Sequence, residues 1–129
     1  MAAPGGRDLD ALLGALDVER RPGTFAYVSR SALDPAPGDT LATIDEGESI
    51  TYVVPVETAP DDAVFHCAWL TLTVESSLEA VGLTAAFAAV LADAGIPANV
   101  LAGWHHDHIL VPVERADDAM AALRSLASR

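Results

Sequence analysis

The chain has no lysine, and its seven basic residues are all arginines, set against 19 acidic residues. A formal net charge of −12 repels a phosphate backbone or an anionic lipid surface, so neither nucleic-acid binding nor membrane binding is expected. No apolar run approaches the roughly 18 residues that a membrane-spanning helix needs. The first residues lack the charged-then-apolar layout of a signal peptide, so we expect a cytoplasmic protein.

Residue patterns that support catalysis are also missing. The sequence has no glycine-rich phosphate loop and no serine nucleophile elbow. Its single cysteine, Cys67, excludes an internal disulfide, and its place in an apolar segment predicts a buried side chain. The neighbouring His66 would face the other way in a strand, so the two cannot form a nucleophilic pair. We expect a protein that is not an enzyme and that has no cofactor.

Aromatic residues make up only 5% of the chain and hydrophobic residues 51%, which predicts a core built mostly from alanine, valine and leucine. Periodicity predicts an alternation of helices and strands. Helices are expected at residues 8–16, 78–94 and 116–126, and strands at residues 24–29, 41–44, 50–56, 69–74, 99–102 and 109–113. The proline-rich residues 32–39 are expected to form a loop.

A short internal repeat divides the chain. Residues 54–61 and 111–118 match at six of eight positions, and both copies end the second strand of a predicted hairpin. The first copy has the loop 32–39 where the second copy has a long helix. The repeat therefore predicts two tandem βαββα halves, residues 1–63 and 64–129, of which the first has lost its helix.

The βαββα order, with Gly82-Leu83 at the start of the long helix and Gly95-Ile96 at its end, resembles the ACT domain. Residues 76–85 and 106–112 are similar to those of stand-alone bacterial ACT-like proteins of unknown function that contain two tandem halves. The resemblance implies an α+β, ferredoxin-like fold, with a mostly antiparallel sheet and helices packed on one face. The ordinary ACT module has a further strand after its second helix, so the early end of this chain implies strands shared between the halves.

The resemblance also implies a binding site for a small amino acid or a related carboxylate. ACT domains bind such ligands between the loop that follows the first strand and the second strand of a neighbouring module. Carried over to this chain, the site residues are Ser76, Ser77, Leu78, Gly82 and Asn99. Free N–H groups at a helix start favour a carboxylate. In the alternative interpretation, Ser76 and Glu79 form a capping box that satisfies the same N–H groups internally.

A second candidate site is the cluster of His105, His106 and His108 around Asp107. Imidazole and carboxylate groups bind zinc, nickel or copper. Successive side chains of a strand point to opposite faces, however, so His106 and His108 would form an incomplete site. The alternative is a polar hairpin tip in which Asp107 helps the turn.

The long helix carries two apolar stripes. Leu83, Phe87, Val90, Leu91 and Ala94 should pack on the sheet, whereas the second stripe consists of Val81, Ala85, Ala88 and Ala92. Either the N-terminal helix or a second chain should cover this second stripe, which makes a homodimer plausible. We expect a non-catalytic regulatory module that senses a small carboxylate, with a structural or protein-interaction module as the alternative.

Overall fold

The computed structural model describes residues 8–75 and 77–128. Its helices are α1 (Leu9–Ala15), α2 (Leu83–Asp93) and α3 (Ala116–Arg124), with short 3-10 turns η1 (Val56–Thr58), η2 (Val113–Arg115) and η3 (Ser125–Ser128). Its strands are β1 (Val18–Arg20), β2 (Phe25–Ser31), β3 (Ala42–Asp45), β4 (Ser49–Pro55), β5 (Val64–Leu72), β6 (Asn99–Ala102) and β7 (Asp107–Pro112). Among these described residues, no helix is long and apolar enough to cross a membrane.

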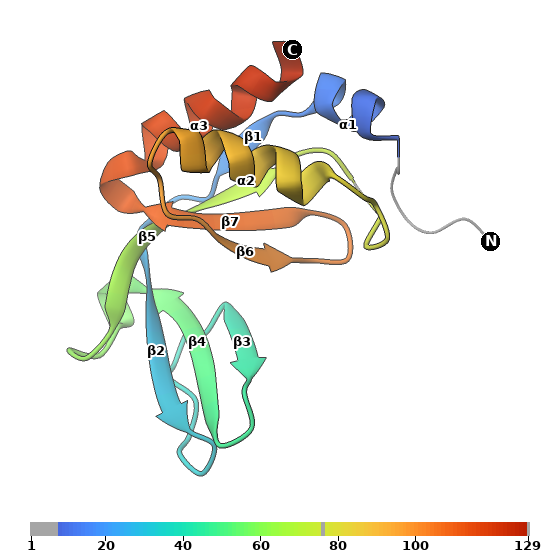
Figure 1. Cartoon of the computed structure of the whole chain (residues 1–129). Coiled ribbons are helices and arrows are strands. Elements are labelled where there is room, and N and C mark those ends of the chain that lie inside the picture. Colours follow the sequence, from blue (N-terminus) through green and yellow to red (C-terminus); the bar gives the residue numbers. More distant parts are fainter. Residues whose placement is uncertain (1–7, 76, 129) are drawn as a thin grey trace.

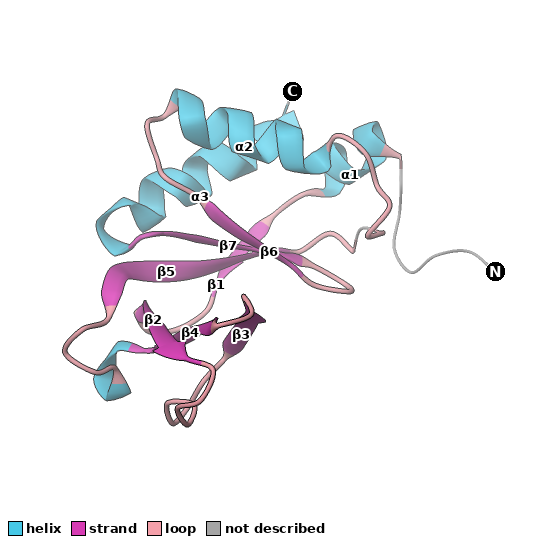
Figure 2. Cartoon of the chain, turned by 60° about the horizontal axis from the view of Figure 1, so that its bottom comes forward, coloured by secondary structure: helices cyan, strands magenta, loops and turns pink. Residues whose placement is uncertain are grey.

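A single curled sheet connects all of the strands. Its order is β3-β4-β2-β5-β7-β6, with β1 also paired to β5, and every recorded pairing is antiparallel. Figure 1 shows α1, α2 and α3 together on one side of the β5–β7–β6 part, while β2, β4 and β3 bend away from the helices. Figure 2 shows the same arrangement from another side. The predicted α+β, ferredoxin-like fold is confirmed.

The central strand β5 has an apolar core on each face. Ala68, Leu70 and Leu72 face the helices and pack in one cluster with Phe87 and Leu123. Cys67 and Trp69 point the other way and pack with Phe25, Val53 and Leu110. The Phe25 and Trp69 rings meet edge to face with centroids 5.6 Å apart. We call the side that carries Trp69 the helix-free face.

The repeated sequence segments occupy equivalent places in the fold. Each copy ends a strand and enters a 3-10 turn: β4 leads into η1, and β7 leads into η2. In the sheet register, Pro55 lies opposite Phe25 of β2, and Pro112 lies opposite Cys67 of β5. Residues 32–41, between β2 and β3, contain turns and no helix. Strand β5 pairs with β2 on one side and with β7 on the other.

The long helix begins later than its periodicity predicts. It starts at Leu83, not at residue 78, because Gly82 has a φ of +95° and lies in the left-handed region. Leu78 and Val81 belong instead to the connecting loop and are 59% and 83% exposed. The predicted first stripe is buried except for Ala94. The second stripe is exposed, so the N-terminal helix does not cover it.

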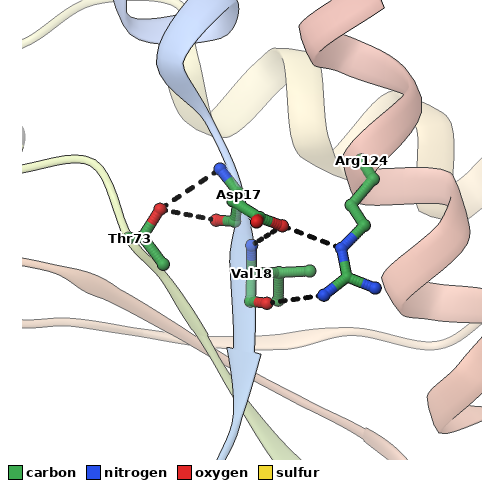
Figure 3. Close-up of polar contacts among 4 residues, drawn as sticks. All are labelled: Asp17, Val18, Thr73 and Arg124. Carbon is green, nitrogen blue, oxygen red and sulfur yellow. Dashed lines mark hydrogen bonds and ion pairs between the residues drawn. The ribbon is translucent and has the colours of Figure 1, made fainter.

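The N-terminal segment is attached to the C-terminal helix by polar contacts (Figure 3). The Arg124 guanidinium of α3 donates to Asp17 Oδ1 at 2.8 Å and to the Val18 carbonyl at 3.2 Å. Thr73 Oγ1 lies 3.2 Å from both the Asp17 N–H and the Asp17 carbonyl. The hydrogen bond from Arg124 lowers the pKa of Asp17. These contacts hold β1, a strand that the sequence pattern did not predict, against the end of β5.

Candidate ligand-binding site

A small cavity lies between the β5–α2 loop, the first turn of α2 and the tip of the β6–β7 hairpin. We call it the loop pocket; its volume is about 80 Å³. It is lined by Ser77, Leu78, Ala80, Leu83, Thr84, Ala102, Gly103 and Asp107. Small-molecule sites are usually roughly 300–1,000 Å³ in volume. The loop pocket alone therefore suits a very small ligand, or the head group of a larger one.

The first N–H groups of α2 have no hydrogen-bond acceptor among the described residues, and two of the residues that carry them, Leu83 and Thr84, line the pocket. Gly82 precedes the helix and has no side chain that could cap it. The first helical hydrogen bond runs from the Ala86 N–H to the Gly82 carbonyl at 3.0 Å. Within residues 8–75 and 77–128, the N–H groups of Leu83, Thr84 and Ala85 have no acceptor. Such unpaired N–H groups at a helix start attract negative charge.

The described residues of the loop before α2 form a turn of their own. Ser77, which is only 5% exposed, accepts a hydrogen bond at Oγ from the Glu79 N–H at 3.1 Å, and its carbonyl accepts from the Ala80 N–H at 3.0 Å. These bonds form a local turn before the helix begins. Ser76, the predicted capping partner of Glu79, lies outside the described residues.

Asp107 is a pocket residue that the sequence analysis treated only as part of a turn. It begins β7, is half-buried and lines the loop pocket. Burial raises the pKa of Asp107, although His108 and His106 partly oppose this effect. The pocket thus contains an acceptor for a positively charged group as well as donors for a negative one.

Two of the predicted site residues are not in the pocket lining. Gly82 shapes the turn, and a Cβ atom there would come within 2.9 Å of Leu9 Cδ2. Asn99 opens β6, an edge strand, where it pairs with Leu110 and is exposed. Ser77 and Leu78 do line the pocket, so the structure brings together part of the predicted set.

The three histidines of the hairpin do not converge. His105 Nδ1 pairs with Glu75 Oε1 at 2.7 Å, whereas His108 Nδ1 lies 3.1 Å from Trp69 Nε1 and 2.9 Å from Thr71 Oγ1. The rings of His105 and His106 are tilted, with centroids 6.4 Å apart. Among the residues that the structure describes, no group of three or more His, Cys, Asp or Glu side chains is placed to hold a metal ion.

Cys67 lies outside the pocket and is fully buried, as predicted. Its Sγ donates to the Phe25 carbonyl at 3.4 Å. Burial raises the pKa of the Cys67 thiol to about 12. A thiol in this state is a packed core group and not a nucleophile.

The fold and the loop pocket together define a small α+β module with a pocket of about 80 Å³ beside a helix start. Models of the ACT domain match residues 4–67 and 64–125. A solved structure from Vibrio cholerae, described as a protein of unknown function and possible transport protein, is 39% identical in sequence to this chain. The match covers 94% of this chain and 97% of the Vibrio cholerae chain, with a TM-score of 0.80. The chain belongs to the ACT-domain family, whose members are regulatory, non-catalytic modules.

Aspartate kinases provide further structures with the same fold. The regulatory subunit from Thermus thermophilus, in ligand-free form, has a TM-score of 0.64 at 11% identity and covers 84% of this chain and 95% of that chain. Aspartokinase III of E. coli, in complex with aspartate and ADP, has a TM-score of 0.63 at 14% identity and covers 100% of this chain and 35% of that chain. No functionally curated protein matches the chain.

Proposed function

We propose that this protein is a cytoplasmic, non-catalytic sensor that binds a small amino acid or a related carboxylate in the loop pocket. The observation that carries the proposal is the start of α2, where Leu83 and Thr84 line the pocket and their N–H groups have no acceptor among the described residues. A ligand carboxylate would accept hydrogen bonds from them and gain from the helix dipole. ACT domains typically bind small amino-acid ligands, which supports this choice of ligand.

Asp107 would select for an amino group at the other end of the ligand. Asp107 lines the pocket together with Leu83 and Thr84 of the helix start. Its raised pKa means that burial disfavours the ionised form of Asp107. A ligand ammonium group that paired with the carboxylate would stabilise this ionised form. An α-amino acid carries both charges within a short distance, so its head group suits a pocket of about 80 Å³.

A second copy of the chain would complete the site. Leu78, Val81 and Trp104, on the loop and the hairpin tip, are 59%, 83% and 61% exposed, and exposed apolar groups beside a small pocket favour a covering partner. Asn99, on the exposed edge strand β6, would then reach the ligand of a neighbouring module, as in the ACT family. We therefore propose a homodimer with ligands bound near its interface.

We also propose that residues 1–63 and 64–129 are two degenerate ACT-like halves. The equivalent places of the repeated segments, at the ends of β4 and β7, support this division. In this view, only the second half keeps the helix that forms the pocket. The chain would then hold one loop pocket for each copy.

A structural or protein-interaction role without a small ligand is the second candidate. The observation that favours it is the exposed stripe of Ala85, Ala88 and Ala92 along α2, with the exposed Val81 in the loop just before it. Such a stripe on a helix surface is suited to contact with another protein. The experiment below separates the two roles.

The test is a thermal-unfolding screen of the purified protein against the standard amino acids at millimolar concentration. A ligand at about 100 times its Kd adds roughly 2.7 kcal/mol of stability, which raises the Tm by several degrees. Asp107→Asn and Asn99→Ala should each remove the shift. Asp61→Asn, at an exposed position in the loop before β5, makes the same charge change away from the pocket and should keep it.

A flat screen with the wild-type protein would contradict the sensor proposal and favour the interaction role. A shift that survives Asn99→Ala would exclude Asn99 from the site, and one that survives Asp107→Asn would exclude the pairing with Asp107. Sedimentation with and without the active amino acid measures the oligomeric state, and a monomer under both conditions would overturn the dimer.

A further inference from the structure

A separate cavity lies where β2 continues beyond the start of β5. Strand β2 pairs with β4 over its whole length, but with β5 only as far as Tyr27, which lies opposite Val64. Beside the unpaired end of β2 is a cavity of about 310 Å³, a volume within the usual range for small-molecule sites. We call it the hydroxyl cavity; it is lined by Tyr27, Val28, Ser29, Thr51, Asp62 and Val64. None of these residues lines the loop pocket.

The sheet register places the three hydroxyl side chains of this lining on one face. Tyr27 and Ser29 are two positions apart in β2 and therefore point to the same side. Thr51 of β4 lies directly opposite Ser29, and Val64 of β5 lies directly opposite Tyr27, so their side chains share that side. Tyr27 packs against the cluster that contains Trp69, which identifies this side as the helix-free face. The four side chains therefore line the cavity from one face of three adjacent strands.

A β-bulge in β5 positions the Tyr27 ring at this cavity. In the bulge, two residues of β5, Phe65 and His66, stand opposite the single residue Ala26 of β2. Phe65 has a φ of +56°, a left-handed conformation that is strained for a bulky side chain. Its ring packs edge to face against Tyr27, with centroids 5.8 Å apart. Bulges and strained residues are frequent next to functional sites, where they direct a side chain, and here they hold the Tyr27 ring at the cavity wall.

The charges at the hydroxyl cavity neutralise each other. Among the described residues of its lining, Asp62 is the one charged residue. Its Oδ2 accepts a hydrogen bond from Arg30 Nη1 at 2.9 Å, and its Oδ1 accepts one from Nη2 at 3.0 Å. Nη1 also donates to the Ser29 carbonyl at 2.8 Å, so the pair attaches the loop before β5 to β2. The hydrogen bond from Arg30 lowers the pKa of Asp62, and the ionised carboxylate stays paired at neutral pH. The described lining therefore offers a ligand no unpaired charge.

Two hydroxyl groups of the lining remain open to a ligand. The Thr51 hydroxyl is already bound to the Glu46 carboxylate. The hydroxyls of Tyr27 and Ser29, in contrast, have no hydrogen-bond partner in the part of the chain that the structure describes. Each can both donate and accept a hydrogen bond. Val64, which is 62% exposed, adds apolar surface beside them. The lining thus combines an aromatic ring and an aliphatic side chain with two polar but uncharged groups.

We propose that the hydroxyl cavity binds a small uncharged aromatic molecule that carries a hydroxyl or amide group. The ligand ring would pack against Tyr27 and Val64, since aromatic pairs gain free energy beyond the burial of their area. Its polar group would exchange hydrogen bonds with the Tyr27 and Ser29 hydroxyls. A charged group would lose its hydration here without meeting an unpaired countercharge, which disfavours the amino acids that suit the loop pocket. The two sites share no lining residue, so this proposal is independent of the proposed sensor function.

The test is a titration of the full-length protein with phenol, with benzamide and with benzoate, followed by proton–nitrogen correlation spectra. The backbone amide signals of Ser29 and Thr51 should move with phenol or benzamide, whereas those of Ala102 and Gly103, which line the loop pocket, should stay in place. Benzoate has the same ring with a negative charge, and its affinity at Ser29 and Thr51 should be about tenfold lower or less. Movement with phenol alone identifies a hydroxyl ligand, movement with benzamide alone an amide ligand, and movement with both a ligand class defined by the ring.

Variants separate a built site from weak binding to any apolar surface. Tyr27→Phe and Ser29→Ala each remove one open hydroxyl and should weaken binding of the active probe about three- to tenfold, the loss expected for one neutral hydrogen bond. Tyr52→Phe is the matched control, because Tyr52 is buried on the other side of the sheet with Val54, and it should leave the affinity unchanged. The proposal would be overturned if the Ser29 and Thr51 signals moved with neither uncharged probe, or if benzoate bound as tightly as benzamide. Equal affinities of the wild type, Tyr27→Phe and Ser29→Ala would also overturn it.

Discussion

His105 of the β6–β7 hairpin and Glu75 of the β5–α2 loop are in direct polar contact, with His105 Nδ1 2.7 Å from Glu75 Oε1. Glu75 stands just before the loop wall of the loop pocket, and His105 stands between Gly103 and Asp107 of its hairpin wall. The contact therefore connects the two walls across the opening.

Breaking this pair should loosen the pocket without unfolding the protein. The side chains of His105 and Glu75 are 58% and 49% exposed, so His105→Ala should change the free energy of unfolding by less than about 1 kcal/mol. Amide hydrogen exchange of residues 77–82 should nevertheless become faster, because the loop loses its link to the hairpin. His106→Ala, which leaves the pair intact, is the control. Unchanged exchange in His105→Ala would show that the pair does not hold the loop.

Gly82 should tolerate no side chain. Gly82→Ala places an alanine at a φ of +95° and brings its Cβ within 2.9 Å of Leu9 Cδ2. We expect a loss of about 1 kcal/mol from the backbone strain, and more from the displacement of Leu9. Gly47→Ala is a matched control, since its φ is +101° and nothing lies within 4 Å of an added Cβ. Urea unfolding measures both, and an equal cost for the two variants would mean that the Leu9 contact adds nothing.

Periodicity predicted the strands and helices whose burial is regular. In β5, the alternation of Trp69 with Leu70 and Leu72 reflects two different cores, so the pattern and the structure agree. The predicted start of α2 was wrong, because Leu78 and Val81 fit the apolar spacing of a helix. That spacing does not reveal that Gly82 adopts a left-handed conformation. Strand β1 was missed because Val18–Arg20 is too short to show a period.

The candidate site was predictable only in part. Ser77 and Leu78 followed from the family resemblance and do line the loop pocket. Asp107 was missed because it joins the pocket through the β6–β7 hairpin, and its histidine neighbours suggested a different chemistry. The sheet register carries the relevant signal: Asp107 lies opposite Ala102, at the end of β6 that meets the start of α2. A sequence pattern does not contain that contact.

The Cys67 thiol should react only when the protein opens. It is fully buried, and burial raises its pKa to about 12, so the native protein should be alkylated very slowly at neutral pH and the denatured protein quickly. Ile109→Val should lower stability by about 0.5–1.5 kcal/mol and speed alkylation several-fold by making opening more frequent. A native rate equal to the denatured rate, or one unaffected by Ile109→Val, would mean that Cys67 is reached without global opening.

Replacing Asp107 should stabilise the ligand-free protein at neutral pH. Burial raises the folded-state pKa of Asp107 above the ordinary value of 3.8, so the protonated side chain favours the fold. This contribution to stability is fully present below the pKa that Asp107 has in the unfolded chain. It is lost as the pH rises through the pKa that Asp107 has in the folded protein. Asp107→Asn mimics the protonated group, and its advantage over the wild type should therefore be present at neutral pH and disappear below about pH 3.8.

The control for this effect is the net charge. In a chain of net charge −12, any lost negative charge relieves repulsion, so Asp61→Asn at an exposed position provides the baseline. Urea unfolding across the acid range should show a larger gain for Asp107→Asn than for Asp61→Asn at neutral pH. Identical curves would show that burial does not disfavour the Asp107 carboxylate. A larger gain would mean that the fold keeps a destabilising charge in the loop pocket, which is the arrangement expected if a ligand ammonium group normally pairs with it.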